Sequence, residues 1–566
     1  MTRVVIDPVT RIEGHLRVEA EVERGRVRNA WTSGTMFRGI EMILQGRDPR
    51  DAWLFAQRIC NVCTTVHALA SVRAVEDALG VTPPPLAVIL RNLIAAFQQV
   101  QDHVVHFYHL HALDWVDVAS AIEADPDDAA ELAQGISDWP GNSPQAFEAV
   151  RKKLEALVAS GMMGPYANGY WGHPAYRLPP EANLMGVAHY LEALDWQREV
   201  IKAHAVLGGK NPLLQTFLVG GTALPVDPDS PTALNTERLS LLRSLATTAR
   251  DFVERVYVPD LLAVAGFYKD WAGLGEATGN FMTCGDLPLD PSGDPESYAF
   301  PGGLILGRDL GRIEPFEQEA VTEEVARAWY ADGAGPLHPF DEDTVPSYTG
   351  PEPPYEQLDV DSAYSWIKSP RYGGRPIEVG PLARVLIGYA GGVPRLRGLV
   401  DHVLATLDVP AEALFSTLGR TAARGIETLY MAELIETLLG QLEERMAAGD
   451  KKIHAGTMWD PAEWPSEARG AGFHEAPRGA LGHWIVIRDG RIARYQCVVP
   501  TTWNASPRDA AGVRGPYEAA LVGTPVVDPE RPIEILRTIH SFDPCIACAV
   551  HVLDAAGQPV GSVEVL

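Results

Sequence analysis

Two pairs of cysteines, one near each end of the chain, constrain its fold more than any other feature of the sequence. Cys60 and Cys63 form the first C-x-x-C pair, and Cys545 and Cys548 form the second. This spacing places both sulfurs of a pair on the same side of a turn, where they can bind one soft metal ion. A single pair is a weak signal, because zinc sites and redox disulfides share it. Two pairs predict one site of four thiolates, and therefore a fold that joins the two ends of the chain.

The composition is that of a globular protein with an ample core, since 46% of the 566 residues are hydrophobic and 21% are charged. A formal net charge of -27 argues against a general nucleic-acid binder, whose surface needs a basic excess. We find no secretory signal peptide at the N-terminus and no uninterrupted apolar run of about 20 residues. Six cysteines are too few for a disulfide framework, so we expect assembly in a reducing compartment.

Local patterns predict a mainly helical α+β chain. Alternating apolar and charged residues within 3–35 predict a half-buried antiparallel pair of strands. A helix from Cys63 to Gly80 would place Cys63 and His67 on one face. Helical periodicity continues at about residues 86–113, 181–207, 232–263 and 381–448. Residues 267–380 are rich in Gly, Pro, Asp and Tyr and predict an irregular, partly β elaboration, and 483–500 predict a hairpin around Asp489-Gly490.

A run of histidines at the end of the first long helix is a candidate for a second metal site. Its titratable members are Asp102, His103, His106, His109, His111 and Asp114. Histidines three apart drift round a helix and often belong to buried polar networks. We therefore favour a hydrogen-bonded network over a metal here.

The flanks of the two cysteine pairs, RICNVCTTVHALASVRAVEDALG and RTIHSFDPCIACAVH, resemble the two signature motifs of the large subunit of nickel–iron hydrogenases. Six further segments resemble the same family in the same order: RIEGHLRVE, FRGIEMILQGRDPRDA, GGKNP, SPRYGGRPIEVGPLAR, EAPRGALGHW and YQCVVPTTWN. The likeness is greatest to the respiratory, membrane-bound uptake type. It implies a central bundle of long helices with antiparallel β segments towards both ends. It also implies one domain over 1–551 and a C-terminal extension, 552–566, which a maturation endopeptidase removes after His551, so that this is a precursor sequence.

The resemblance implies a role for each site residue. Cys60 and Cys545 would be terminal ligands of nickel, and Cys63 and Cys548 would bridge nickel and an iron that also carries carbon monoxide and cyanide. Further residues are implied as follows: Glu13 to carry protons, Arg478 over the metals between Asp102 and Asp543, His67 as a hydrogen-bond donor to a bridging thiolate, and Glu41, His551 and the Cys497 backbone carbonyl as ligands of magnesium. Cys284 and Cys497 match no metal-ligand cysteine, and we expect both to be packed thiols.

Heterolytic cleavage of hydrogen needs a Lewis acid, a base for the proton and a path out for electrons. The resemblance implies this reaction, run reversibly. No cysteine remains for an iron–sulfur cluster in this chain, so electrons would leave through an obligate iron–sulfur small subunit and onward to a membrane cytochrome b. Nickel-insertion proteins are implied as further partners. The implied location is the periplasmic face of the cytoplasmic membrane, reached by export together with the small subunit.

Two other functions stay open at this point. On spacing alone a closed zinc site would be favoured, in a zinc-stapled binding protein. A non-catalytic structural subunit of a respiratory complex is the other, although the four cysteines and His551 argue against it.

Two positions depart from the family pattern. Asn61 replaces a glycine, which asparagine can do because it tolerates left-handed backbone. Leu213 replaces a histidine, and any contact of that histidine with a cysteine sulfur would be lost.

Overall fold

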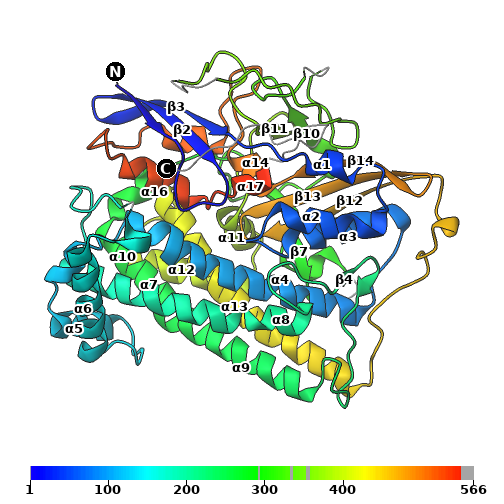
Figure 1. Cartoon of the computed structure of the whole chain (residues 1–566), viewed down its shortest axis with the longest axis horizontal. Coiled ribbons are helices and arrows are strands. Elements are labelled where there is room, and N and C mark those ends of the chain that lie inside the picture. Colours follow the sequence, from blue (N-terminus) through cyan, green and yellow to red (C-terminus); the bar gives the residue numbers. More distant parts are fainter. Residues whose placement is uncertain (1, 168, 291–292, 332–334, 352–356, 550–566) are drawn as a thin grey trace.

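The computed structural model describes residues 2–167, 169–290, 293–331, 335–351 and 357–549. Long helices lie side by side in one half of the molecule, and both three-stranded sheets lie in the other half (Figure 1). The helices of the bundle and its flank are α4 (Pro85–Val105), α7 (Pro180–Val200), α8 (Lys202–Gly208), α9 (Thr236–Phe252), α10 (Val258–Phe267), α11 (Pro381–Ala390), α12 (Pro394–Leu407) and α13 (Thr417–Ala447). The predicted α+β, mainly α fold is confirmed.

The centre of the bundle is the packing of α4 against α13. α4 begins at Pro85. Proline suits this position because the N–H that it lacks would have no partner in the first turn of a helix. The apolar residues Leu86, Leu90 and Leu93 of α4 are buried. The predicted helix end at residue 113 is only partly right. The α-helix ends at Val105, and the histidine run continues it as a wider π-helical turn over His106–His111 and a 3-10 turn over Ala112–Asp114.

Two antiparallel three-stranded sheets occupy the other half. The first contains β1 (Thr2–Ile6), β2 (Leu16–Glu23) and β3 (Arg26–Gly34), and the second β12 (Glu467–Ala476), β13 (Gly479–Arg488) and β14 (Arg491–Val498). Helix α3 (Val66–Leu79) packs on β12 at backbone distance. A Cβ at Gly472 would lie 2.1 Å from the Ala70 carbonyl oxygen, so only glycine fits there. This contact places the first cysteine pair, which precedes α3, beside the second sheet.

The prediction for residues 3–35 is wrong in two respects. The structure has three strands where we predict two, and β2 is buried on both faces. Its polar side chains are paired in the interior, where Arg17 Nη2 lies 2.5 Å from Glu19 Oε1. The backbone N–H of Leu358 also donates to Glu19 Oε1, at 2.9 Å. A segment more than 300 residues away therefore covers the face that alternation alone assigns to solvent.

The hairpin at 483–500 is confirmed, with Asp489 and Gly490 at its turn and both at positive φ, 47° and 72°. Between 268 and 380 the described residues form short strands and 3-10 turns without an α-helix: β6 (Phe281–Thr283), β7 (Asp286–Pro288), β8 (Tyr298–Phe300), β9 (Gly303–Ile305), β10 (Val321–Glu324) and β11 (Ser369–Tyr372). Shorter elements complete the described chain: α1 (Ile40–Leu44), α2 (Ala52–Ala56), β4 (Phe217–Leu218), β5 (Gly221–Thr222), α14 (Pro500–Asn504), α15 (Pro516–Leu521), α16 (Ile533–Ser541) and α17 (Ile546–Ala549).

Among the helices of the described ranges, none combines the length and the apolar character that crossing a lipid bilayer requires.

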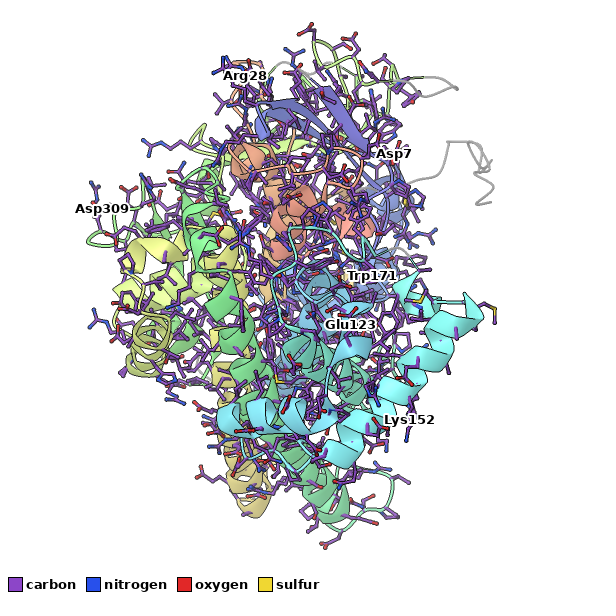
Figure 2. All side chains as sticks on the ribbon, turned by 90° about the vertical axis from the view of Figure 1, so that its left-hand side faces the viewer. Asp7, Arg28, Glu123, Lys152, Trp171 and Asp309 are labelled. Atoms are coloured by element: carbon purple, nitrogen blue, oxygen red, sulfur yellow. The ribbon has the colours of Figure 1, made fainter. Side chains whose placement is uncertain are left out.

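Helices α5 (Pro126–Ile136) and α6 (Pro144–Ser160) form a pair at the edge of the molecule, where Lys152 points outward (Figure 2). A buried histidine ties this pair to the bundle. His189 on α7 bonds through Nδ1 to Asp260 Oδ2 at 2.7 Å and through Nε2 to Asn142 Oδ1 at 2.9 Å. Asn142 lies between α5 and α6, and its amide group donates to two backbone carbonyls, which turns its oxygen towards the ring.

The His189 contact predicts a pH-dependent contribution to stability. Burial alone would lower the pKa of His189, but the charge of Asp260 and its hydrogen bond to the ring together outweigh burial and raise the pKa above the ordinary 6.5. A raised pKa in the folded state means that the contribution is complete below the ordinary pKa and is lost as pH rises through the raised value. We expect His189→Gln to lower the free energy of unfolding by about 2 kcal/mol near pH 6, and by less near pH 9. Thermal unfolding at both pH values measures the effect, with replacement of the exposed His402 by glutamine as the control. An equal loss of stability at pH 6 and at pH 9 in His189→Gln would contradict the prediction.

Candidate metal centre

The two cysteine pairs meet in the interior. Segments from the two ends of the chain, drawn in blue and red, lie together around α17 (Figure 1). Cys60 follows a 3-10 turn in extended backbone, and Cys63 stands just before α3. Cys545 follows Asp543, which takes a left-handed backbone, and leads into α17. The expectation that Cys63 lies on the helix with His67 is wrong by one turn, because α3 begins at Val66.

All four sulfurs lie within 4.8 Å of one another and are buried in the main hydrophobic core. The shortest separations are 3.0 Å for Cys545–Cys548, 3.5 Å for Cys60–Cys545 and 3.6 Å for Cys63–Cys548. These are contacts between free thiols, since a disulfide needs about 2.05 Å. The predicted convergence of both ends is therefore confirmed.

The donor set suits a soft transition metal rather than magnesium or calcium. Burial raises the pKa of Cys548 well above its ordinary value, whereas hydrogen bonds from the other cysteines outweigh burial and lower the pKa of Cys60. Four thiolates this close need cations to be ionised together. Three of the cysteines, Cys63, Cys545 and Cys548, line a small cavity together with other residues: Val66, His67, Ala476, Pro477, Arg478, Leu481, Pro500 and Thr501.

Arg478 is fixed over this cavity by Asp543. Its Nη2 lies 2.9 Å from Asp543 Oδ1, and its Nε donates to the Asp543 carbonyl at 3.0 Å. Asp102 is more distant, with Oδ2 at 3.7 Å from Arg478 Nη1. Within the described residues, both of these atoms are buried without a hydrogen-bond partner. A charged hydrogen-bond donor therefore lines the cysteine cavity, where a group bound at the sulfurs would accept from it.

The charges around Arg478 are shifted by their surroundings. Burial alone would lower the pKa of Arg478, but the negative charges of Asp543 and of the cysteines raise it well above its ordinary value. Burial raises the pKa of Asp102 to about 8. Its oxygen Oδ1 accepts a hydrogen bond from Gln98 Nε2 at 2.6 Å. The guanidinium is therefore permanently charged, while Asp102 can hold a proton near neutral pH.

Glu13 is held beside the second cysteine pair by its own backbone. Its carbonyl accepts from the Ile546 N–H at 2.7 Å, and Glu13 and Cys545 form a parallel β-bridge. The next residue must be glycine: Gly14 has φ 85°, and a Cβ there would lie 2.4 Å from the Ala547 nitrogen. Burial, together with the charge of Cys60, raises the pKa of Glu13. A carboxylate with a raised pKa is a stronger proton acceptor.

His67 lines the cavity together with Cys63 and Cys548, and its ring is oriented from behind. His67 Nδ1 lies 3.0 Å from His483 Nε2, and His483 Nδ1 lies 2.7 Å from the Tyr495 hydroxyl group. All three side chains are buried. The contact of His483 fixes the plane of the His67 ring against the cysteines, as groups behind a metal-site histidine commonly do.

A second polar cluster surrounds Glu41, one of the residues predicted to bind magnesium. Glu41 Oε1 accepts from the Cys497 N–H at 3.1 Å, and Oε2 accepts from the Thr344 hydroxyl group at 2.9 Å. Nearby, Lys368 Nζ lies 2.8 Å from Glu342 Oε1. The oxygen-rich surroundings suit a hard cation. His551 lies outside the described residues, so its place in this cluster stays a prediction.

The histidine run forms the predicted hydrogen-bonded network. His103 bonds to Glu427 Oε1 at 2.8 Å, His106 to the His540 carbonyl at 2.6 Å, and His109 to the Tyr190 carbonyl at 3.1 Å. His111 Nδ1 lies 3.3 Å from Asp114 Oδ2.

The two departures from the family pattern have different outcomes. The reason that we give for Asn61 is wrong, because this exposed residue takes no positive φ and the turn needs no glycine there. Leu213 lies in the turn after α8, at φ 61°, and it is not among the residues that line the cysteine cavity. A role for Leu213 in tuning the site stays a prediction.

Two residues at the site escaped the sequence argument. Arg424 on α13 is fully buried, with Nη1 at 3.2 Å from Asp543 Oδ2 and 2.8 Å from His103 Nδ1. Thr501 accepts the Cys545 N–H at 3.1 Å through its hydroxyl group. Thr501 stands in the segment YQCVVPTTWN, which we single out only as a whole. Nothing local marks Arg424, because a charged helix residue is ordinarily expected at the surface.

Four buried thiols between a helical bundle and a sheet, with a guanidinium lining their cavity and the backbone of Glu13 paired with that of Cys545, define a class of protein: redox metalloenzymes whose transition-metal centre is buried. The family is narrower. A family model described as nickel-dependent hydrogenase matches residues 38–551. The chain belongs to this family, and its four-cysteine site supports a nickel–iron centre.

The relatives agree over full length. The chain is 50% identical to the uptake hydrogenase large subunit of Rhizobium leguminosarum bv. viciae, over 100% of this chain and 97% of that protein. It is 48% identical to the hydrogenase-1 large chain of Escherichia coli (strain K12), with the same two coverages. Among solved structures, the Ni-Fe-Se hydrogenase from D. vulgaris Hildenborough matches with a TM-score of 0.76 and 35% identity, over 97% of this chain and 100% of that chain.

Proposed function

We propose that this chain is the catalytic subunit of a nickel–iron hydrogenase of the respiratory uptake type, which cleaves H2 reversibly into protons and electrons. The observation that carries the proposal is the convergence of four buried sulfurs, with Arg478 lining the cavity beside them and the backbone of Glu13 paired with that of Cys545. When bound, the nickel–iron centre supplies the Lewis-acid and redox chemistry of heterolytic cleavage.

The protein's own contribution is to hold ligands, charge and a proton acceptor in fixed positions. Cys60 and Cys545 would hold nickel terminally, and Cys63 and Cys548 would bridge to iron, whose carbon monoxide and cyanide ligands come from the family. The Glu13 carboxylate accepts the proton beside Cys545. Arg478 lines the cavity, and its Nη1 lacks a hydrogen-bond partner among the described residues, so its fixed positive charge would stabilise negative charge that develops there during the reaction.

The remaining assignments follow from the family. His67 would donate a hydrogen bond to a bridging thiolate, and Asp102 and Asp543 would hold Arg478. Magnesium would be held by Glu41, His551 and the Cys497 carbonyl. Electrons would pass to an iron–sulfur small subunit in a heterodimer and onward to a membrane cytochrome b. Export with that subunit would bring the enzyme to the periplasmic face of the cytoplasmic membrane, after nickel-insertion proteins have acted.

Metal analysis of this chain, separated from its iron–sulfur small subunit after purification of the complex, tests the proposal. We expect nickel and iron in equal amounts in the separated chain, and hydrogen-dependent dye reduction by the complex before separation. Zinc alone would instead support a zinc-stapled binding protein, in which no charged donor needs to face the sulfurs. Absence of metal would support a structural subunit of a respiratory complex.

Maturation by cleavage after His551 predicts a change in mass. Active enzyme is expected to contain a chain that ends at His551, because the endopeptidase acts once nickel is in place. Intact-mass spectrometry of the active complex measures this directly, with protein from cells grown without nickel as the uncleaved control. A full-length chain in active enzyme would contradict the prediction.

A further inference from the structure

The loop that carries Glu13 is anchored by groups that the reaction does not otherwise use. Arg11, two residues before Glu13, donates from Nη2 to Asp114 Oδ1 at 2.5 Å and from Nη1 to the Leu110 carbonyl at 2.6 Å. Arg11 itself takes φ 58°, a backbone conformation that costs an L-residue free energy. Such a conformation persists when surrounding contacts over-determine it. The loop is therefore held in place from outside rather than by its own preference.

Asp114 also holds the other side of the site. His540 on α16, five residues before Cys545, bonds through Nδ1 to Asp114 Oδ2 at 2.6 Å. The opposite ring nitrogen, Nε2, bonds to the Thr10 carbonyl at 2.9 Å. Asp114 thus binds directly to Arg11, on the Glu13 side, and to His540, on the Cys545 side. The bonds run through one fully buried carboxylate.

The cluster of His111, Asp114 and His540 has the spacing of a metal site, since their ligand atoms lie within 4.8 Å of one another. Its bonding favours another role. The guanidinium of Arg11 occupies one Asp114 oxygen, and a cation beside it would be repelled. His111 Nε2 accepts from Trp115 Nε1 at 3.1 Å, so His111 directs an N–H, not a lone pair, at Asp114. The cluster is closed by its own hydrogen bonds.

The π-helical turn over His106–His111 takes part in this junction. It continues α4 almost to Asp114, and the Leu110 carbonyl within it accepts from Arg11. Burial opposes ionisation of Asp114, but Arg11 and His540 hold its pKa well below the usual range. Asp114 is therefore a carboxylate at the junction of the N-terminal loop, the end of α4 and α16.

We propose that Asp114 is a positioning residue that sets the separation of the Glu13 carboxylate and the Cys545 sulfur by binding Arg11 and His540 at once. The inference rests on the proposed role of Glu13 in proton transfer. Without the Asp114 charge, the loop and the end of α16 lose their shared anchor, and the backbone bond from Ile546 to Glu13 opens more often. Proton transfer slows, while the four cysteines still bind the metals.

Asp114→Asn in the complex with the small subunit tests the inference. The matched control is Asp260→Asn, because Asp260 is also buried and binds a histidine, His189, while its other hydrogen bond, from Tyr108, joins neither the Glu13 loop nor α16. The first readout is amide hydrogen exchange of a peptide spanning 544–549. We expect protection there to fall by about tenfold in Asp114→Asn, since Ile546 and Ala547 donate to the Glu13 carbonyl, and to stay unchanged in the control.

The second readout is dye reduction per bound nickel in H2O and in D2O. We expect a fall of about tenfold or more in Asp114→Asn, with a larger solvent isotope effect, because misplacing the acceptor makes proton transfer limiting. Asp260→Asn should keep the wild-type activity per nickel and the wild-type solvent isotope effect. Wild-type exchange and wild-type activity per nickel in Asp114→Asn would overturn the inference.

A further variant covers the case in which Asp114→Asn does not accumulate with metal. Arg11→Lys keeps the charge but loses the two-pronged contact to Asp114 and Leu110, and we expect an intermediate rise in exchange at 544–549. Wild-type exchange in that variant would overturn the inference as well. Failure of the underlying function gives a different pattern, because Glu13→Gln would then be as active as wild type. If Glu13→Gln is inactive and Asp114→Asn is normal, only the positioning role is wrong.

Discussion

Replacing Cys545 with serine is expected to lower hydrogen-dependent dye reduction by at least about 10³-fold. Cys545 lies 3.0 Å from Cys548 and 3.5 Å from Cys60, so it is shared by the shortest sulfur contacts of the site. A serine hydroxyl group is a hard, weakly acidic donor and replaces a thiolate poorly at a soft metal. Nickel content, measured by elemental analysis of the purified complex, should fall together with the activity.

Cys284→Ser is the matched control for this experiment. Cys284 is a free thiol outside the four-sulfur cluster, and its sulfur donates to Glu475 Oε1 at 3.2 Å. A serine there can keep that hydrogen bond, so we expect nickel content and activity close to wild type. Normal nickel and normal activity in Cys545→Ser would mean that the four sulfurs are not the metal ligands, and the proposed function would fail with them.

Replacing Glu13 with glutamine is expected to lower hydrogen oxidation by about 10²- to 10⁴-fold while nickel and iron stay bound. Glutamine preserves the shape of the side chain and the backbone bond to Ile546, but its amide group cannot take a proton at neutral pH. The raised pKa of Glu13 makes the wild-type carboxylate a better acceptor, and that advantage is lost entirely. Dye reduction per bound nickel is the measurement.

Glu21→Gln provides the control for Glu13→Gln. Glu21 lies on β2 of the same N-terminal sheet and pairs loosely with Arg3, at 3.9 Å. Its loss should change activity per nickel by less than twofold or so, because a partly exposed ion pair contributes little. Equal activity in the two variants would show that the proton leaves nickel's surroundings by a route that does not use Glu13.

Several elements were predictable because the forces that form them are local. The hairpin around Asp489 and Gly490 needs only two residues at positive φ between apolar strands, and both are present. The start of α4 needs a proline and an apolar repeat. The sheet at residues 2–34 was predicted only in part, because the polar face of β2 is covered by the segment around Leu358. The alternation of apolar and polar residues along a strand indicates which face packs on the core, but it does not show whether a distant segment covers the polar face.

By itself, the sequence predicted four cysteines as metal ligands and determined that both ends of the chain must meet, because thiolate chemistry and C-x-x-C spacing belong to a few adjacent residues. Only the tertiary structure decided how the surrounding charges are arranged. Arg424 reaches Asp543 from α13, and Asp114 binds Arg11 and His540 from opposite ends of the chain. Such contacts arise because burying a charge is favourable only when a partner is buried beside it, and that partner is chosen by the packing of the whole fold.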